Sequence, residues 1–236
     1  MLVVAILFNS CKKSDSLKAI DGCPVSSLIS TGYLNDAKEI VYRRILNGDH
    51  VSDGNKPEFN QQELDRVLSA IQSVYALQTI QTDTIFNIVR IHTFKHYILN
   101  SIVLKINLNA PEIQNLISQQ PTGNAAFDDL LAKYSFTYDS TSPPSPTLPY
   151  LTIKSNNWYN TQALIPYFKQ FSFIPSAQSD GSVGDGNDIT YTLNGNTRTL
   201  NFSIGFGDCP AGCGGRKTWQ FNVDENCKAG FVKLIE

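Results

Sequence analysis

Two cysteines separated by three residues stand in the stretch FGDCPAGCGGRKTW, residues 206–219, between two strand-like segments. A structural zinc site needs three or four thiolates or imidazoles, usually from C-x-x-C pairs, and a thioredoxin-type redox site needs C-x-x-C at a helix N-terminus. The spacing of Cys209 and Cys213 fits neither chemistry. Gly212 can adopt the positive φ of a tight turn, which brings two Cα atoms within the roughly 4.4–6.8 Å that a disulfide needs. We therefore predict a disulfide that staples this turn.

A second group of reactive side chains lies in SDGSVGDGNDI, residues 179–189. Asp180, Asp185, Asn187 and Asp188 offer hard oxygen ligands of the kind that Ca²⁺ prefers. The segment GDGND resembles one turn of the repeat-in-toxin nonapeptide, but that family binds calcium between successive turns and this sequence has a single copy. A glycine-rich hairpin loop with solvated carboxylates explains the same residues. We expect such a loop and no cofactor, with calcium as the alternative.

The other groups that could do chemistry are histidines and neighbouring carboxylates. His92 and His96 would share one face of a helix and could bind a metal there. The β-branched and aromatic run over residues 84–96 predicts a strand instead, in which positions four apart are about 13 Å distant. Asp128 and Asp129 are adjacent on a predicted helix and point apart, whereas paired catalytic carboxylates must converge. No G-x-S-x-G motif, phosphate loop or dinucleotide fingerprint is present, so nothing here argues for an enzyme.

The N-terminal stretch MLVVAILFNSCKKSD has the pattern of a targeting signal. Residues 2–8 are apolar or small, far fewer than the roughly 20 that span a bilayer, and they fit the h-region of a secretory signal. Ser10 followed by Cys11 resembles the lipobox of bacterial lipoproteins, although Phe8 stands where such boxes usually have Leu. The resemblance implies a signal peptide over residues 1–10 and acylation of Cys11, which would anchor an exported protein to the outer membrane or cell surface, on either face. A buried N-terminal strand with a free cysteine is the alternative.

Export would place the remaining cysteines in an oxidising compartment, where disulfides persist. Cys23, Cys209, Cys213 and Cys227 allow three connectivities. If Cys209 pairs with Cys213, then Cys23 must pair with Cys227 and close almost the whole chain. Loop-closure entropy assigns about 5 kcal/mol to this long loop and about 2 kcal/mol to the short one.

Composition excludes one class of partner. Only 17% of the 236 residues are charged, the net charge is −2 and the isoelectric point is near 5.9. The adjacent basic pairs are Lys12–Lys13, Arg43–Arg44 and Arg216–Lys217, too few to neutralise a nucleic-acid backbone. The hydrophobic fraction of 42% is sufficient for one large domain or two small ones. We therefore expect no nucleic-acid partner.

Periodicity predicts how the N-terminal half is organised. Residues 11–32 are polar and suited to a tether. Apolar residues at helical spacing predict a helix over residues 34–46 and a second helix that begins after Asn60, with Glu63 completing a capping box. We expect these two helices to form a hairpin within a helical region of residues 33–100.

The rest of the chain predicts an α+β domain over residues 101–236. Residues 101–178 have the order strand, helix, strand, then a proline-rich linker (139–149), and again strand, helix, strand, with FSFIP as the last strand. This order is that of the ferredoxin-like sandwich. Two hairpins follow, the first across an NGN turn, and form a β-meander that carries the cysteines. The predicted fold class is α+β.

Two resemblances add to this interpretation. The segment YLTIKSNNWYNTQALIPYFKQFSFIPSAQSDG, residues 150–181, is similar to the last β-α-β unit of subtilase propeptides, in which the sheet packs against the protease and the C-terminal tail enters its cleft. The stretch GDCPAGC followed by a tryptophan is similar to one found in uncharacterised lipid-anchored secreted proteins of Gram-negative bacteria. The first implies a fold and the second a location.

Three hypotheses of function follow from these patterns. The first is a non-catalytic lipid-anchored binding or interaction module for a protein or glycan partner, to which aromatic side chains such as Trp158, Tyr159 and Trp219 would supply contacts. The second is a propeptide-like protease inhibitor or folding assistant. The third is a calcium- or metal-dependent hydrolase that uses Asp180, Asp185 and Asp188.

Overall fold

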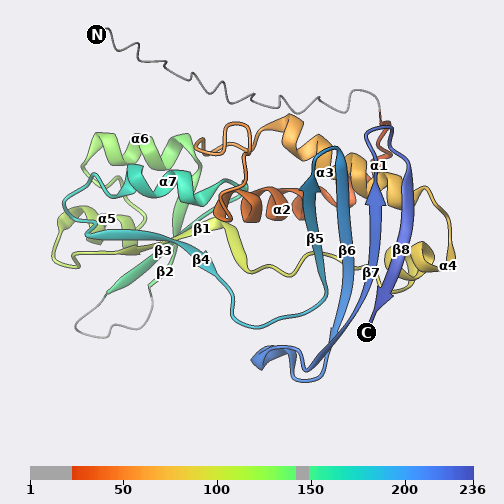
Figure 1. Ribbon diagram of the computed structural model, residues 1–236. Coiled ribbons are helices and arrows are strands. Elements are labelled where there is room, and N and C mark those ends of the chain that lie inside the picture. The colour runs from red at the N-terminus through yellow and green to blue at the C-terminus, as the bar shows by residue number, and fades with distance from the viewer. Residues whose placement is uncertain (1–22, 142–148) are drawn as a thin grey trace, which may run out of the picture.

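The computed structural model describes residues 23–141 and 149–236, which form two four-stranded antiparallel sheets with helices (Figure 1). The predicted signal peptide (1–10), Cys11 and most of the predicted tether lie outside the described residues. The helical elements are α1 (Ser27–Gly32), α2 (Leu34–Leu46), α3 (Gln61–Tyr75), α4 (Ile80–Asp83), the π-helix η1 (Thr84–Ile88), α5 (Pro111–Ile117), α6 (Ala125–Lys133), α7 (Thr161–Phe168) and the 3₁₀ turn η2 (Cys209–Ala211). The strands are β1 (Tyr97–Lys105), β2 (Phe136–Thr141), β3 (Tyr150–Ser155), β4 (Ser176–Gly181), β5 (Asp188–Asn194), β6 (Thr197–Phe206), β7 (Gly215–Val223) and β8 (Ala229–Ile235).

The first sheet confirms the predicted ferredoxin-like core. Its strand order is β2-β3-β1-β4 and all neighbours are antiparallel. Helices α5 and α6 connect β1 to β2, and α7 connects β3 to β4, so each β-α-β segment encloses one antiparallel strand. We call residues 97–181 the ferredoxin-like unit. Its buried core includes Ile102, Leu104, Ile113, Phe127, Leu131, Leu151, Ile153, Leu164 and Phe168.

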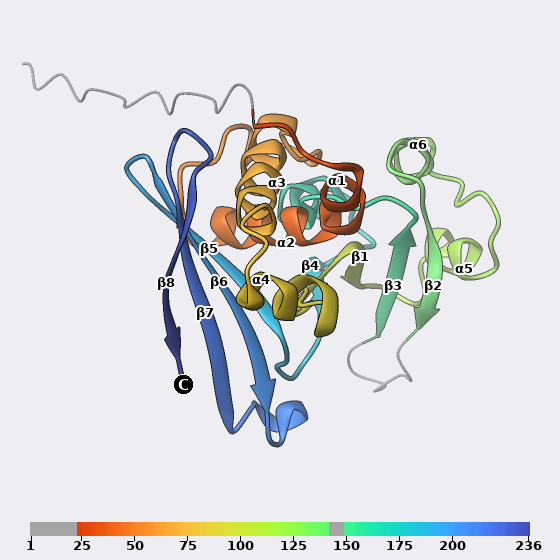
Figure 2. The same cartoon turned by 90° about the vertical axis from the view of Figure 1, so that its right-hand side faces the viewer.

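The second sheet confirms the predicted meander. Strands β5 to β8 pair in chain order, and the first hairpin aligns Ile189 with Phe202 and Tyr191 with Leu200. Gly195 in the NGN turn has φ +58°, a conformation that glycine adopts readily. Helices α1 to α3 cover one face of this sheet (Figures 1 and 2). The shared core includes Ile29, Ala37, Ile40, Val41, Leu64, Val67, Ile71, Val74, Ile189, Leu200, Phe202, Trp219, Phe221 and Val223.

The predicted domain boundaries, 33–100 and 101–236, are wrong. The N-terminal helices share their core with strands β5 to β8, so residues 23–96 and 182–236 form one helix–meander unit into which the ferredoxin-like unit is inserted. An amphipathic helix pair and a one-faced sheet each have an apolar side that must be covered, and here they cover each other. The prediction grouped the meander with the segment that directly precedes it in the chain, whereas the meander packs on the N-terminal helices.

The strand predicted over residues 84–96 is also wrong. Thr79 and Thr82 form a capping box that starts α4, and the π-helix η1 continues it. Residues 89–96, here called the connector, then follow as an irregular segment that is not part of a sheet. The backbone N–H groups of Thr93 and Phe94 donate to carboxylates instead, so side chains replace a neighbouring strand.

The segment FSFIP, residues 171–175, is a turn rather than a strand. Phe171 and Phe173 pack edge-to-face on Phe127, with ring centroids 4.9 and 5.2 Å apart. The aromatic residues that suggested a strand therefore fill the core beneath α6 from an irregular segment, and β4 begins only at Ser176.

The tether predicted over residues 11–32 ends earlier than expected, since residues 27–32 form α1. Val25, Ile29 and Tyr33 recur every fourth position and pack into the core of the helix–meander unit, where Ile29 is fully buried. This sparse apolar spacing lies within a polar stretch, and it is sufficient to bring the segment into the fold.

The capping box predicted at the start of α3 is only half formed. Asn60 accepts hydrogen bonds from the N–H groups of Gln62 and Glu63 at 2.9 and 3.3 Å. The Glu63 side chain turns inward instead of back to Asn60, where its carboxylate pairs with Arg44 at 3.0 Å and with Arg66 at 2.5 Å. The buried carboxylate joins α2 to α3.

The cysteines pair as the sequence predicts: Cys23 with Cys227 and Cys209 with Cys213. The Cα atoms are 6.0 and 3.9 Å apart, the second closer than the expected range, and Gly212 has φ +107°. The two bridges lie at opposite ends of the second sheet (Figure 1). Two disulfides indicate an oxidising, exported environment. Of the helices in residues 23–141 and 149–236, none is long and apolar enough to cross a membrane.

The two disulfides should differ in their contribution to stability. They join residues 204 and 4 positions apart, so loop entropy assigns about 5 and about 2 kcal/mol. We expect the double variant Cys23→Ser/Cys227→Ser to lose about 3 kcal/mol more unfolding free energy than Cys209→Ser/Cys213→Ser. Urea unfolding of a Trp158→Phe background, in which Trp219 of β7 is the one tryptophan left, measures this in the helix–meander unit. Equal losses in the two double variants would contradict it.

Candidate functional site

Helix α2 lies between the second sheet and the ferredoxin-like unit (Figure 1) and is buried on nearly all sides. Its apolar side chains Ala37, Ile40 and Val41 belong to the helix–meander core. The polar side chains Asp36, Glu39, Tyr42 and Arg43 instead contact the connector, β5 and the ferredoxin-like unit. We call these contacts the α2 seam.

At the start of α2, a carboxylate orients a histidine. Asp36 accepts hydrogen bonds from the Thr93 N–H at 2.6 Å and the Thr93 hydroxyl at 2.9 Å, and its Oδ2 lies 2.9 Å from Nδ1 of His92. Tyr33 stacks on the imidazole, with centroids 4.7 Å apart. The hydrogen bond to Asp36 raises the pKa of His92, whose side chain is 49% exposed. The favourable interaction with protonated His92 weakens as pH rises through that pKa.

One turn further along, two carboxylates share one guanidinium. Arg43 contacts Glu39 Oε1 at 3.2 Å and both oxygens of Asp188 at 2.9 and 3.0 Å, and it also donates to the carbonyl of Phe94. Asp188 in turn accepts from the Phe94 N–H at 2.9 Å. Arg43 therefore joins α2, β5 and the connector.

Glu39 is the least well satisfied of these groups. It is 1% exposed, and its Oε2 is buried with no hydrogen-bond partner in the part of the chain that the structure describes. Burial raises the pKa of Glu39 to about 7, because the attraction of Arg43 only partly offsets the loss of solvation. The seam thus contains an acid that changes its charge near neutral pH.

Tyr42 connects α2 to the ferredoxin-like unit. Its hydroxyl lies 3.1 Å from Oγ1 of Thr161 at the start of α7 and 2.8 Å from Oγ of Ser179 in β4. Its ring packs edge-to-face on Tyr97 of β1, with centroids 5.0 Å apart. These contacts fix the angle at which the inserted unit meets the helix.

The two histidines of interest do not share a site. His92 bonds to Asp36, whereas His96 packs on the Phe94 ring and lines a shallow pocket of about 250 Å³ with Arg43, Leu46, Asn47 and Tyr97. Across the described ranges, no three residues among His, Cys, Asp and Glu are grouped so as to hold a metal ion.

The four candidate calcium ligands are also not brought together. Asp188 faces Arg43, and Asp185 accepts from Arg216 and from the Gly186 N–H. The hydrogen bond from Arg216 lowers the pKa of Asp185. Asp180 Oδ1 accepts from the Gly181 N–H, and Asn187 Oδ1 accepts from the Gly205 N–H. Arginines and backbone donors thus occupy the oxygens that a cation would need.

The stapled turn forms an exposed end of the molecule. The Asp185 N–H donates to the Cys209 carbonyl at 2.9 Å, which ties the acidic loop to the turn. Phe206 and Val183 are both exposed there. A β-carbon on Gly205 would collide with Sγ of Cys213, so this position requires glycine.

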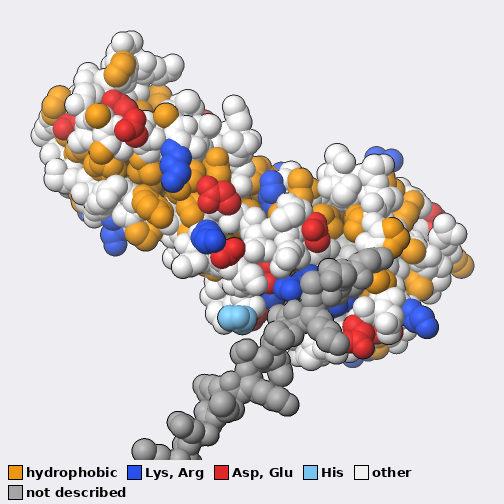
Figure 3. Space-filling view, turned by 90° about the horizontal axis from the view of Figure 1, so that it is seen from above, with side chains coloured by type: hydrophobic (Ala, Val, Ile, Leu, Met, Phe, Trp, Pro, Cys, Tyr) orange, Lys and Arg blue, Asp and Glu red, His pale blue; other side chains and the backbone are white. Residues whose placement is uncertain are grey.

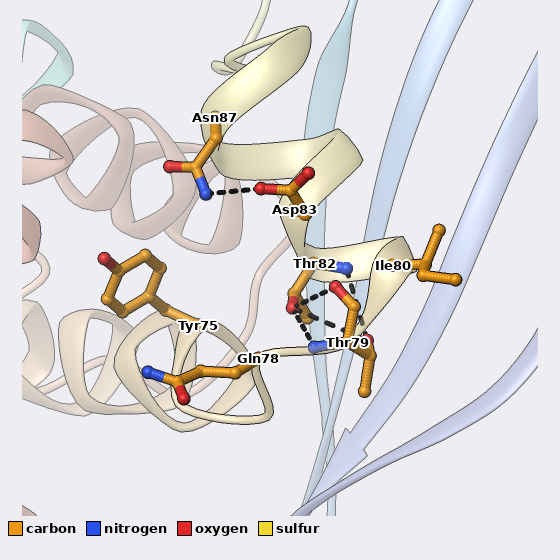
Figure 4. A pocket seen from close by; sticks show the side chains of 7 residues that line it. All are labelled: Tyr75, Gln78, Thr79, Ile80, Thr82, Asp83 and Asn87. Carbon is orange, nitrogen blue, oxygen red and sulfur yellow. Dashed lines mark hydrogen bonds between the residues drawn. The ribbon is translucent and has the colours of Figure 1, made fainter.

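A pocket of about 420 Å³ lies between the end of α3 and the α4–η1 segment (Figure 4). Its lining combines an aromatic ring with amide, hydroxyl and carboxylate groups. The Asn87 amide donates to Asp83 Oδ1 at 2.8 Å, and Thr79 and Thr82 are occupied in their capping box. The lining residues are Tyr75, Gln78, Thr79, Ile80, Thr82, Asp83 and Asn87.

Sequence reasoning did not find the seam or this pocket. Asp36, Glu39 and Arg43 recur at spacings of three and four along α2, beside the apolar stripe of Ala37, Ile40 and Val41, and this spacing is the signal of a second, polar contact face. The pocket had no comparable signal, because it depends on the turn that joins α3 to α4.

No protein-family model, curated protein or solved structure matches this chain.

Glu39 should make stability depend on pH. Its pKa is raised from 4.5 to about 7, so between these values the folded protein retains a proton that the unfolded chain has released, and stability falls as pH rises. His92, whose pKa is raised above 6.5 by Asp36, acts in the same direction, and both the variant and the wild type keep that part of the slope. We expect Glu39→Gln to remove a loss on the order of 2 kcal/mol between pH 5 and 8.

Urea unfolding at a series of pH values measures this slope. Glu58→Gln, which alters an exposed glutamate, is the matched control and should leave the wild-type slope in place. An unchanged slope in Glu39→Gln would show that the buried carboxyl does not titrate in this range.

Proposed function

We propose that this chain is an exported lipoprotein, acylated at Cys11, whose folded part is a non-catalytic binding module held close to a membrane. The observation that supports this most strongly is the disulfide between Cys23 and Cys227. It fastens the start of the folded part only twelve positions after Cys11, and twelve extended residues reach at most about 40 Å. A bridge at this point would keep a pull on the anchor from unravelling α1.

The face of the molecule seen in Figure 3 favours a neutral ligand. Acidic and basic side chains are interspersed over the face in Figure 3 instead of gathering into one patch of a single sign. Together with the net charge of −2, this supports the expectation that nucleic acid is not the partner.

Strand addition to β8 is a less favourable mode of binding. This edge strand exposes Phe231, Val232, Leu234 and Ile235, but it also carries Lys233 and a register shift opposite Gln220 and Phe221. A lysine and a bulge are devices by which natural edge strands avoid pairing. The pocket beside α4 therefore supports the proposal better than this edge.

The two other hypotheses have weaker support. A propeptide-like inhibitor needs a free chain after its last strand, but Ser182 after β4 is bonded to the backbone of Lys95 and His96 and the chain continues into β5. A hydrolase that uses Asp180, Asp185 and Asp188 needs converging carboxylates, and these are held apart by their own partners.

The anchor is tested by Cys11→Ala in the full chain. We expect the variant to move from the membrane fraction to the soluble fraction, because it loses the residue that carries the acyl groups. Membrane fractionation with immunodetection, with globomycin treatment of the wild type alongside, measures this. Cys23→Ala is the matched cysteine control and should stay with the membrane. A Cys11→Ala protein that partitions like wild type would refute the anchor.

A further inference from the structure

The turn between α3 and α4 creates the pocket of Figure 4. Leu77 packs against the core while Gln78 adopts φ +47°, which is uncommon for a residue other than glycine. The chain then enters the capping box of Thr79 and Thr82 and the π-helix η1, a type of helix that is frequent at functional sites. The backbone thus places two short helical segments across the end of α3, with a hollow between them.

The polar groups of the pocket are held in position, and several of their donor and acceptor atoms have no hydrogen-bond partner among the described residues. Because Asn87 donates to Asp83 Oδ1, the carboxylate and the amide are held in fixed positions. Asp83 Oδ2 and the amide oxygen of Asn87 accept no hydrogen bond from any described residue, and neither does the Gln78 side chain take part in one. In Figure 4, Asn87 and Asp83 lie on one side of the hollow and Gln78 on the other. Donors and acceptors therefore face it from two sides.

An aromatic ring forms a third side. Tyr75 is partly buried and packs edge-to-face on Phe86, with centroids 5.3 Å apart, so the ring is held in place. Figure 4 shows it beside the hollow, opposite Asp83. Ile80 at the rim is 84% exposed. Tyrosine offers an apolar face together with a hydroxyl, which suits a ligand that is itself apolar on its faces and polar round its edge.

The charge and size of the pocket limit the ligand further. Its seven lining residues contain one carboxylate and no lysine or arginine, which disfavours phosphate and other anions. The hydroxyls and amides disfavour a purely apolar ligand, because they would lose their hydration without replacement. A volume of about 420 Å³ lies within the range of small-molecule sites. A pyranose has C–H groups on its faces and hydroxyls, each both donor and acceptor, round its edge.

We propose that this pocket binds a neutral sugar residue of a glycan, with Tyr75 packed on the ring and Asp83, Asn87 and Gln78 bonded to its hydroxyls. The assignment rests on the proposed function, since it names the ligand class of the tethered module. The fixed pair of Asp83 and Asn87 sets the orientation of the sugar ring from one side, and the Gln78 amide bonds to the hydroxyls on the opposite side of the ring.

The test uses the full chain in detergent and a panel of neutral oligosaccharides: the tetrasaccharides of cellulose, starch, chitin and β-galactan. Calorimetry or ligand-observed NMR should detect millimolar or tighter binding of at least one of them. Asp83→Ala and Asn87→Ala should each weaken that binding about tenfold or more. Asp65→Ala, an exposed aspartate on α3 that bonds to Gln61, is the matched control and should bind like wild type.

Tyr75→Ala also removes packing on Phe86, so Tyr75→Phe is measured beside it and should retain most of the binding. The proposal is overturned if no neutral tetrasaccharide binds, if the Asp83 and Asn87 variants bind like wild type, or if a polyamine such as spermidine binds there in place of sugars. Each of these outcomes leaves the Cys11→Ala fractionation unaffected. If the chain binds a sugar but the Cys11→Ala variant partitions like wild type, the proposed membrane anchor is wrong and the sugar site stands.

Discussion

Polar contacts, among them those of Tyr42 on α2, hold the two halves of this protein in a fixed relation. The two hydrophobic cores are separate sets of residues, so burial of apolar surface explains each unit but not the way in which they join. The join includes polar contacts: the Tyr42 hydroxyl bonds to Thr161 and Ser179, and the Asn160 amide donates to the carbonyls of Gly54 and Lys56. Such contacts are directional, and a buried polar group that loses its partner is costly, so they select one orientation rather than a range. The same directionality brings a cost at Glu39, where one carboxylate oxygen is left unsatisfied among the described residues.

Because one unit is inserted into the other, the N-terminal and C-terminal segments of the chain must come together to form a common core. Residues before β1 and after β4 must find each other across the whole ferredoxin-like unit before the second core exists. That unit has short-range connections of its own and can collapse independently, whereas the helix–meander unit depends on long-range closure. The bridge between Cys23 and Cys227 removes much of the freedom that opposes this closure. The pocket beside α4 lies in the unit that is stabilised in this way.

The parts of the fold that the sequence predicts are those that depend on local patterns of residue type. The helix over residues 34–46, the ferredoxin-like order and both hairpins follow from periodicity and turn residues, and they were predicted correctly. The element that packs on each apolar face was not predicted. Periodicity shows that α3 has an apolar face, but it does not show that β6 and β7 cover that face. The segment over residues 84–96 misled because β-branched residues such as Ile85 fit a π-helix when its apolar side meets a core. The pocket depends on the positive φ of Gln78. Glutamine uncommonly adopts this conformation, so the residue type does not predict it.

The order of the cysteines along the chain has a consequence for export. A chain that crosses a membrane from its N-terminus presents Cys23 before the three other paired cysteines, and its partner Cys227 follows only after nearly all of the remaining chain. In the interval Cys23 is a free thiol that meets Cys209 and Cys213 before its proper partner. Those two lie four positions apart, and closing so short a loop is faster than joining either of them to a distant thiol. The short bridge therefore forms in preference to a bridge from Cys23 to either of them, which leaves Cys227 as the partner of Cys23.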